Sequence, residues 1–183
     1  ILGIEAALAS AKPSFANHKM FSKEFSGDYV IASCYNGLPY GGGAYTLARL
    51  ILSNIAKKAK NTEDYLENVL PHVMDVMARY MDERIRFMVE ESGFFENNFL
   101  AKEGFIKRER FSAMFGLVGL AEAVDILLEK EGKGNLRFGH SEEATALGVK
   151  IMDAIERFNN AHENKYCEVS GNHFLLHAQV GIS

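Results

Sequence analysis

Apolar stretches that suit short strands alternate along the chain with longer segments of helical spacing. Residues 28–32 (DYVIA) are short and rich in β-prone side chains, which indicates a buried strand. Residues 110–120 (RFSAMFGLVGL) are largely apolar, and their two glycines favour a strand that runs into a turn. The last apolar stretch, 173–180 (HFLLHAQV), is strand-like as well. Strands that alternate with helices in this way predict a helix-rich α/β unit with a parallel sheet.

The longest helix is expected over residues 62–91. Asn61 or Thr62 can cap its first turn, and Pro71 is expected to kink it, because proline lacks a backbone N–H. Its apolar positions recur at steps of three and four: Leu66, Leu70, Val73, Met77, Met81, Ile85 and Met88. This spacing predicts that one side of the helix is buried.

The same spacing indicates shorter helices elsewhere. Residues 1–11 suit a short helix, and a second is expected to begin near Ala44, with apolar side chains at Leu47, Leu50, Ile51 and Ile55. A third passes through 121–128. A fourth begins after Ser141, whose hydroxyl suits the cap position.

The composition is that of a globular protein and argues against nucleic-acid-binding and membrane proteins. The chain has 183 residues, of which 48% are apolar and 24% charged, as in a globular domain with one core. The net charge of −4 and the short basic groups argue against a nucleic-acid partner. No apolar run reaches the roughly 18 residues of a membrane span, so no membrane association is expected. Two cysteines and no secretory signal predict a cytoplasmic protein with reduced thiols.

The two ends of the chain suggest a longer protein. The chain begins ILGIEAALAS without a methionine and stops at HAQVGIS directly after an apolar run. We therefore expect residues 1–183 to be one unit that is an internal piece of a larger enzyme.

The stretch SCYNGLPYGGGAYTL places Cys34 ahead of a loop that contains Gly41, Gly42 and Gly43. Such a loop can cradle a phosphate at a helix N-terminus, bind a metal, present a reactive thiol or make a tight turn. It lacks the lysine and the spacing of a P-loop. No Lys, Arg or His adjoins Cys34, which argues against a thiolate and permits a neutral thiol.

Other polar side chains are candidates for binding. Glu122 lies inside the apolar run GLVGLAEAV, where an unpaired buried carboxylate is costly, so it reaches water, caps the helix start or contacts a polar ligand. His173 and His177 share one face of the expected strand but lie far apart, and CxxC and HExxH are absent, so no metal site is expected. Cys167 is interpreted as a small core residue.

The order of these segments resembles that of glycyl radical enzymes. The segment TLARL at 46–50 stands after the cysteine loop, where the anaerobic ribonucleotide reductases have a TINLPRIA-like segment. The segment FGLVGLAEA at 115–123 is similar to their GVVGLNEA segment. Together with PYGGGAYTLARL and the closing HFLLHAQVG, these motifs most resemble the YjjI family of glycyl radical enzymes, over residues 27–183.

The resemblance implies a fragment of a ten-stranded α/β barrel, with residues 1–26 as a helical lead-in and 27–183 as the barrel segment. It implies that a radical-SAM activating enzyme installs a glycyl radical, which oxidises Cys34 to a thiyl that abstracts hydrogen from a small-molecule substrate in a lyase-like or reductase-like reaction. The residues expected to line the substrate cavity are Asn36, Glu122, His173 and His177. The glycines expected to shape the loop are Gly41, Gly42 and Gly43.

The chain also departs from the family pattern. The stretch EVSGN at 168–172 lacks the arginine and the aromatic residue of a glycyl radical motif, so Gly171 is interpreted as a turn glycine. The radical glycine is therefore expected outside this chain, which would bind no cofactor of its own and be inactive alone. The sequence also leaves open whether the chain forms a homodimer. The alternative is a non-enzymatic, helix-rich structural or interaction domain in which Cys34 belongs to the core.

Overall fold

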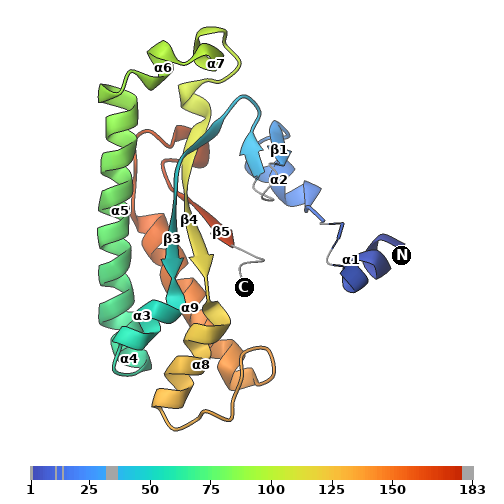
Figure 1. The fold of residues 1–183 in the computed structure, drawn as a ribbon, viewed down its shortest axis with the longest axis vertical. Coiled ribbons are helices and arrows are strands. Elements are labelled where there is room, and N and C mark those ends of the chain that lie inside the picture. The colour runs from blue at the N-terminus through green and yellow to red at the C-terminus, as the bar shows by residue number, and fades with distance from the viewer. Residues whose placement is uncertain (1, 11, 14, 32–36, 179–183) are drawn as a thin grey trace.

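A three-stranded parallel sheet organises the molecule (Figure 1). The computed structural model describes residues 2–10, 12–13, 15–31 and 37–178. The strands are β3 (Gly43–Ile51), β4 (Phe111–Val118) and β5 (Leu175–Ala178), and β4 lies between the other two. Helical segments connect each strand to the next, so the predicted α/β unit with a parallel sheet is confirmed.

The first connection, from β3 to β4, contains the long helix that the sequence predicts. Its continuous segments are α4 (Thr62–Asp64), the π-helical η1 (Tyr65–Val69), α5 (Leu70–Arg86) and the π-helical η2 (Phe87–Glu91). Shorter helices flank it: α3 (Leu52–Lys58), α6 (Phe94–Asn97), α7 (Phe99–Lys102) and η3 (Arg108–Arg110). Asn61 caps the long helix, since its side chain accepts a hydrogen bond of 2.9 Å from the backbone N–H of Asp64.

A π-helical turn, wider than an α-helical one, directly precedes the position where the sequence predicts a kink at Pro71. In the π-helical turn η1, the backbone N–H of Leu70 donates to the carbonyl oxygen of Tyr65. Proline lacks an N–H, and its ring crowds the carbonyl of the preceding turn. A π turn immediately before the ring gives that carbonyl more room, and the long helix continues through it.

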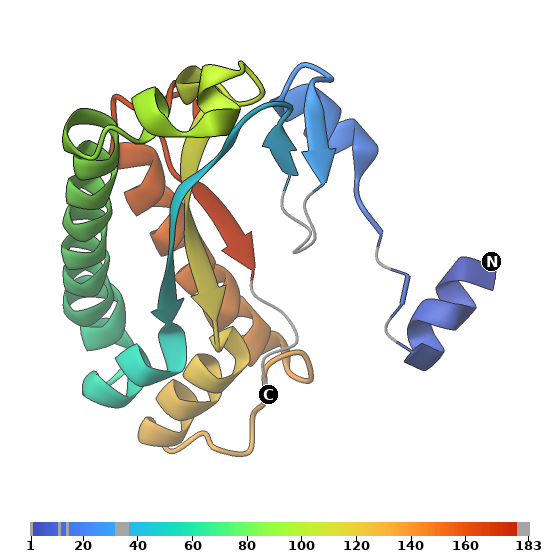
Figure 2. The ribbon, with the colours of Figure 1, turned by 45° about the horizontal axis from the view of Figure 1, so that its top comes forward.

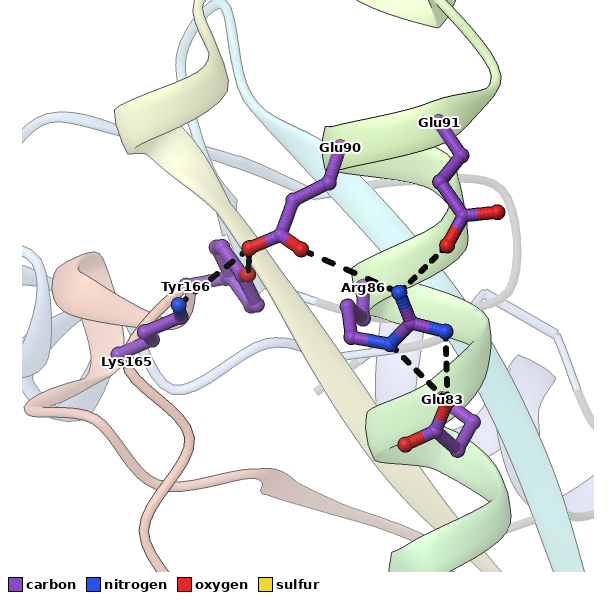
Figure 3. A network of polar contacts seen from close by, with 6 residues as sticks. All are labelled: Glu83, Arg86, Glu90, Glu91, Lys165 and Tyr166. Atoms are coloured by element: carbon purple, nitrogen blue, oxygen red, sulfur yellow. Dashed lines mark hydrogen bonds and ion pairs between the residues drawn. The ribbon is translucent and has the colours of Figure 1, made fainter.

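The end of the long helix is tied to the segment before β5 by polar side chains (Figure 3). Glu90 accepts hydrogen bonds from the Tyr166 hydroxyl and, at 3.3 Å, from the Lys165 ammonium. These contacts, the Tyr166 hydrogen bond first, hold the pKa of the Glu90 carboxyl below its usual value. Arg86 pairs with the neighbouring acids Glu83 and Glu91.

The helix expected from Ala44 is wrong, because residues 43–51 form strand β3 and the helix begins at Leu52. Alternate side chains of β3 are buried, among them Ala48 and Leu50, whereas Ile51 is 45% exposed. Pairing with β4 along the strand decides the conformation here, and the apolar spacing fits a strand as well as a helix. The glycine loop therefore opens a strand, which removes the helix N-terminus on which a phosphate cradle depended.

The second connection, from β4 to β5, follows the prediction closely. Its helices are α8 (Leu120–Lys130), α9 (Glu142–Ala161) and the short 3₁₀ turn η4 (Glu168–Ser170). Ser141 caps α9 by accepting a hydrogen bond of 3.3 Å from the backbone N–H of Ala144. Gly171, with φ of 67°, ends η4 as the expected turn glycine.

The hydrophobic core lies between one face of the sheet and its helices. Phe115 of β4 and Phe174, which precedes β5, pack edge to face with ring centroids 5.4 Å apart. Cys167 is fully buried, and burial raises the pKa of its thiol to about 11. The interpretation of Cys167 as a small core residue is therefore confirmed.

A small antiparallel hairpin lies on the side of the sheet away from α5 (Figure 2). It consists of β1 (Tyr29–Ile31) and β2 (Gly37–Pro39), which follow the helices α1 (Leu2–Ser10) and α2 (His18–Glu24). The predicted strand at 28–32 is therefore confirmed in its described part, but it is not buried, since Val30 is 42% exposed. A two-stranded hairpin outside the main sheet leaves much of its surface to solvent.

The described residues thus form a sheet of three strands and a hairpin of two, and the ten-stranded barrel stays a proposal. None of the helices in the described ranges is long and apolar enough to cross a bilayer.

Candidate active site

The candidate site is framed by the β1–β2 hairpin, whose strands are joined by residues 32–36. Cys34 and Asn36 belong to this connection and lie outside the described residues. The strands on either side are described, and Ile31 stands opposite Gly37 in the antiparallel register. The structure therefore defines the two strands that hold the cysteine loop, residues 32–36, and the contacts that fix these strands to the rest of the molecule.

One guanidinium ties both ends of the hairpin to the main sheet. Arg110, directly before β4, donates from Nη1 to Oδ2 of Asp28 at 2.5 Å and to the backbone oxygen of Tyr40 at 2.6 Å. Asp28 precedes β1, and Tyr40 follows β2. Charge-assisted hydrogen bonds between a guanidinium and a carboxylate are among the stronger polar contacts in proteins. The hairpin is thereby held against the start of β4.

The hairpin also packs against α2. The rings of Phe21 and Tyr29 stack with centroids 5.3 Å apart, and the Tyr29 hydroxyl shares a hydrogen bond of 2.7 Å with Nδ1 of His18. A Cβ added to Gly37 would lie 2.2 Å from the Phe21 ring. A larger residue at position 37 would therefore displace the Phe21 ring from its packing against the hairpin.

The three glycines after the hairpin pass close to the segment that enters β4. A Cβ on Gly42 would lie 2.0 Å from the carbonyl oxygen of Arg110, and one on Gly43 would lie 2.7 Å from the ring of Phe111. Gly41 adopts φ of +72° and accepts a hydrogen bond of 2.9 Å from the backbone N–H of Lys107. The loop is a tight turn against another backbone segment, and its role in shaping the cysteine loop stays a prediction.

The face of the sheet away from the core carries a row of residues from all three strands. In the parallel register, Arg49 of β3 is opposite Gly116 of β4, and Gly116 is opposite His177 of β5. The neighbours Ala48 and Phe115 belong to the core, so the alternation of side chains directs this row to the other face. A Cβ on Gly116 would lie 3.2 Å from Cγ of Arg49, so the stem of this arginine leans across β4.

The remaining candidates lie elsewhere. Glu122 is exposed in the first turn of α8. Of the three alternatives that the sequence left open, this position agrees with a carboxylate that reaches water. His173 precedes β5, and its Nδ1 hydrogen-bonds the backbone oxygen of His162 at 3.0 Å. His177, four residues later, lies within β5. A role in substrate binding stays a prediction for all three residues.

Within the described ranges, no three or more His, Cys, Asp or Glu side chains gather as they would around a metal ion. The polar groups nearest the hairpin base are instead the paired Asp28 and Arg110, and those on the open sheet face are Arg49 and His177. The described part of the site therefore combines an ion pair at the hairpin base with hydrogen-bonding side chains on the sheet.

All residues 1–183 match the sequence model of a family described as glycyl radical enzyme YjjI-like. The chain belongs to this family. The match includes the hairpin, the glycine turn and all three sheet strands, so the resemblance inferred from the separate motifs is confirmed over the whole chain.

Two relatives in the YjjI-like family are similar over most or all of the chain. An uncharacterized protein of Haemophilus influenzae is 47% identical over 182 residues, which cover 100% of this chain and 35% of that protein. The uncharacterized protein YjjI of Escherichia coli is 42% identical over 174 residues, which cover 94% of this chain and 33% of that protein. The chain spans about a third of the length of these curated relatives.

A solved structure of an anaerobic ribonucleotide reductase is also similar, with a TM-score of 0.49 and 18% identity. The similarity covers 70% of this chain and 19% of that one.

Sequence reasoning missed the polar residues that organise this part of the YjjI-like chain. Arg110 and Asp28 are 82 residues apart, and nothing in the local pattern of either predicts their contact. The position of Arg49 on a sheet was missed because its segment was predicted to be a helix. An alternation of apolar residues with Arg49 between them, directly after a glycine turn, is the signal that could have placed it on the open face of a strand.

Proposed function

We propose that this chain forms the cysteine-bearing part of a glycyl radical enzyme, in which Cys34 becomes a thiyl radical that abstracts a hydrogen atom from a small-molecule substrate. The observation that carries the proposal is the family match over all 183 residues. The anchored hairpin supports it, because Cys34 belongs to the connection between two strands held by Arg110 and α2.

The proposed setting is the interior of an α/β barrel. In such barrels, helices cover the outside of the sheet and the other face of each strand turns inward. The sheet β3–β4–β5 carries its core-forming helices on one face, and the β1–β2 hairpin lies on the side away from α5 (Figure 2). A closed barrel would exclude water and competing hydrogen donors from a radical intermediate.

The proposed radical step needs a glycyl radical on a residue outside this chain, installed by a radical-SAM activating enzyme. The glycyl Cα takes the hydrogen atom of the Cys34 thiol, so a C–H bond forms, the S–H bond breaks and the unpaired electron moves to sulfur. This step uses a neutral thiol. The absence of Lys, Arg and His beside Cys34 in the sequence suits that protonation state.

A test that needs no knowledge of the substrate uses hydrogen exchange. The full-length protein is activated anaerobically in D₂O, where a thiol hydrogen exchanges with solvent and a Cα hydrogen does not. We expect the radical glycine to acquire deuterium through Cys34, measured by mass spectrometry of the quenched protein and by the hyperfine splitting of the radical spectrum. In Cys34→Ala, the glycyl radical should form and the glycine should stay undeuterated.

The second cysteine supplies the matched control. Cys167→Ala removes a thiol that is buried in the core, so deuterium transfer should persist. Transfer that continues at the native rate in Cys34→Ala, or that stops only in Cys167→Ala, would show that Cys34 is not the relay. Once a substrate is known, Cys34→Ala should also abolish its turnover.

A further inference from the structure

The face of the sheet opposite the hydrophobic core carries two nitrogen-containing side chains on either side of a glycine on the buried central strand. Arg49 and His177 occupy the same register level as Gly116, which lies between them on the central strand. Adjacent strands are about 4.8 Å apart, so the backbones of Arg49 and His177 are separated by roughly 10 Å. Gly116 places no side chain between them, and side-chain atoms of β3 lie close to the position that its Cβ would take.

The arginine side chain already leans over this glycine. The position of a Cβ on Gly116 lies 3.2 Å from Cγ of Arg49 and 3.4 Å from Cδ1 of Leu47. The stem of Arg49 therefore lies against β4, the strand between β3 and the strand that carries His177. A larger residue at position 116 would displace this stem from the sheet.

The guanidinium charge of Arg49 is not neutralised by a carboxylate in the described part of the chain. Within those residues, neither Arg49 nor His177 forms an ion pair with a carboxylate, whereas Arg86 and Arg110 each do. A guanidinium presents a planar set of N–H donors that matches two oxygens of a carboxylate or phosphate. An imidazole adds a further donor from the opposite side.

We propose that Arg49 and His177 together bind an oxyanion group of a small ligand, a carboxylate or a phosphate, above Gly116. That this oxyanion belongs to the substrate of the radical reaction rests on the proposed function. The binding of an oxyanion at this row does not, because it requires only the register and the side chains of β3, β4 and β5.

The test is a titration of the full-length protein, without activation, with sodium phosphate and separately with sodium acetate at constant ionic strength. Isothermal calorimetry measures each Kd. We expect binding of at least one anion, weakened about tenfold or more in Arg49→Gln and several-fold in His177→Gln. The first substitution removes the charge and the fork of donors, and the second replaces the imidazole by an amide whose donors have a different position and reach. Preference for phosphate or for acetate identifies the kind of oxyanion.

Two further variants sharpen the result. Arg157→Gln removes the same charge from an exposed position on α9 and should change the Kd by less than twofold. Arg49→Lys keeps the charge without the fork of donors, so its affinity should fall between those of the native protein and Arg49→Gln. If an Arg49 variant fails to fold, the anion affinity of His177→Gln still tests the site, because His177 lies on a different strand.

The proposal is overturned if the native protein binds neither anion, or if Arg49→Gln and His177→Gln bind as the native protein and Arg157→Gln do. The titration is repeated with Cys34→Ala, in which we expect the native Kd. Loss of deuterium transfer and loss of anion binding are then separate outcomes, so failure of the radical mechanism and failure of this site can be told apart.

Discussion

Gly42 shows how a single residue can be fixed by a segment distant in sequence. The space that its side chain would occupy is filled by the backbone oxygen of Arg110, 2.0 Å from the ideal Cβ position. A backbone atom at the start of β4 cannot rotate away as a flexible side chain can. The turn after the hairpin is therefore possible only where no Cβ intervenes.

We expect Gly42→Ala to destabilise the protein by about 1–3 kcal/mol, because overpacking forces the backbone to shift. Gly134→Ala is the matched control, since its Cβ would meet Glu129 atoms no closer than 3.7 Å. That variant should change stability by less than about 0.5 kcal/mol. Thermal unfolding of the two variants beside the native protein measures the difference, and equal midpoints would contradict the steric argument.

The buried thiol of Cys167 should make the stability of the fold depend on pH in the alkaline range. Burial raises the pKa of its thiol from 9.0 to about 11, so the folded state holds this proton more tightly than the unfolded state does. The resulting stabilisation is complete below pH 9 and is lost as the pH rises towards 11. We expect the loss to reach up to about 2 kcal/mol. The free energy of unfolding, measured at pH 8 and pH 10.5, should fall less in Cys167→Ala than in the native protein. An equal fall in both proteins would contradict the raised pKa of the Cys167 thiol.

The element that depends most on one side chain is the β1–β2 hairpin. Its strands have three residues each and expose much of their surface, and such a hairpin is marginally stable by itself. Arg110 holds both of its ends, and α2 covers Gly37. The position of the cysteine loop therefore depends on contacts outside the hairpin.

We expect Arg110→Met to loosen the hairpin without unfolding the main sheet, because the two hydrogen bonds to Asp28 and Tyr40 are lost. Amide hydrogen exchange should become at least tenfold faster at residues 29–31, 37 and 38 and stay unchanged in β4. Arg108→Met, two residues away and exposed, is the control and should leave both segments unchanged. Unchanged exchange in the hairpin would show that α2 alone positions it.

At the scale of elements, the sequence predicted the helices better than the first strand of the sheet. The helix at 62–91, the strand into turn at 110–120 and the Ser141 cap depend on local spacing and local hydrogen bonds, and the structure confirms them. Strand β3 has apolar residues that fit either period, and its conformation is decided by pairing with β4, some 68 residues later. Local pattern cannot supply a partner so far away.

The whole molecule presents a sheet with two edges. Within the described residues, β3 and β5 each have β4 as their one neighbour, and the exposed apolar residues on these edge strands include Leu47, Ile51 and Leu176. Unpaired strand edges with apolar side chains favour association with other chains. A continuous barrel would pair both edges.

We therefore expect the 183-residue chain, expressed by itself, to associate as its concentration rises. Light scattering coupled to size-exclusion chromatography measures the mass. Charged substitutions at two edge positions, Leu47→Lys and Ile51→Glu, should reduce the association, whereas Val76→Lys on the exposed side of α5 should not. A monomer that unfolds cooperatively at all concentrations would instead support a self-sufficient domain.

The sequence by itself determined the family and most of the alternation of strands and helices, because these depend on motifs, spacing and residue type along the chain. The role of Cys34 in radical chemistry stays a prediction. The tertiary structure decided that the glycine loop opens a strand, that Arg110 fastens the hairpin, and that Arg49, Gly116 and His177 form one row. Each of these depends on pairing or packing between segments far apart in sequence. Such contacts follow from strand register and close backbone approach, and no local pattern of side chains specifies them.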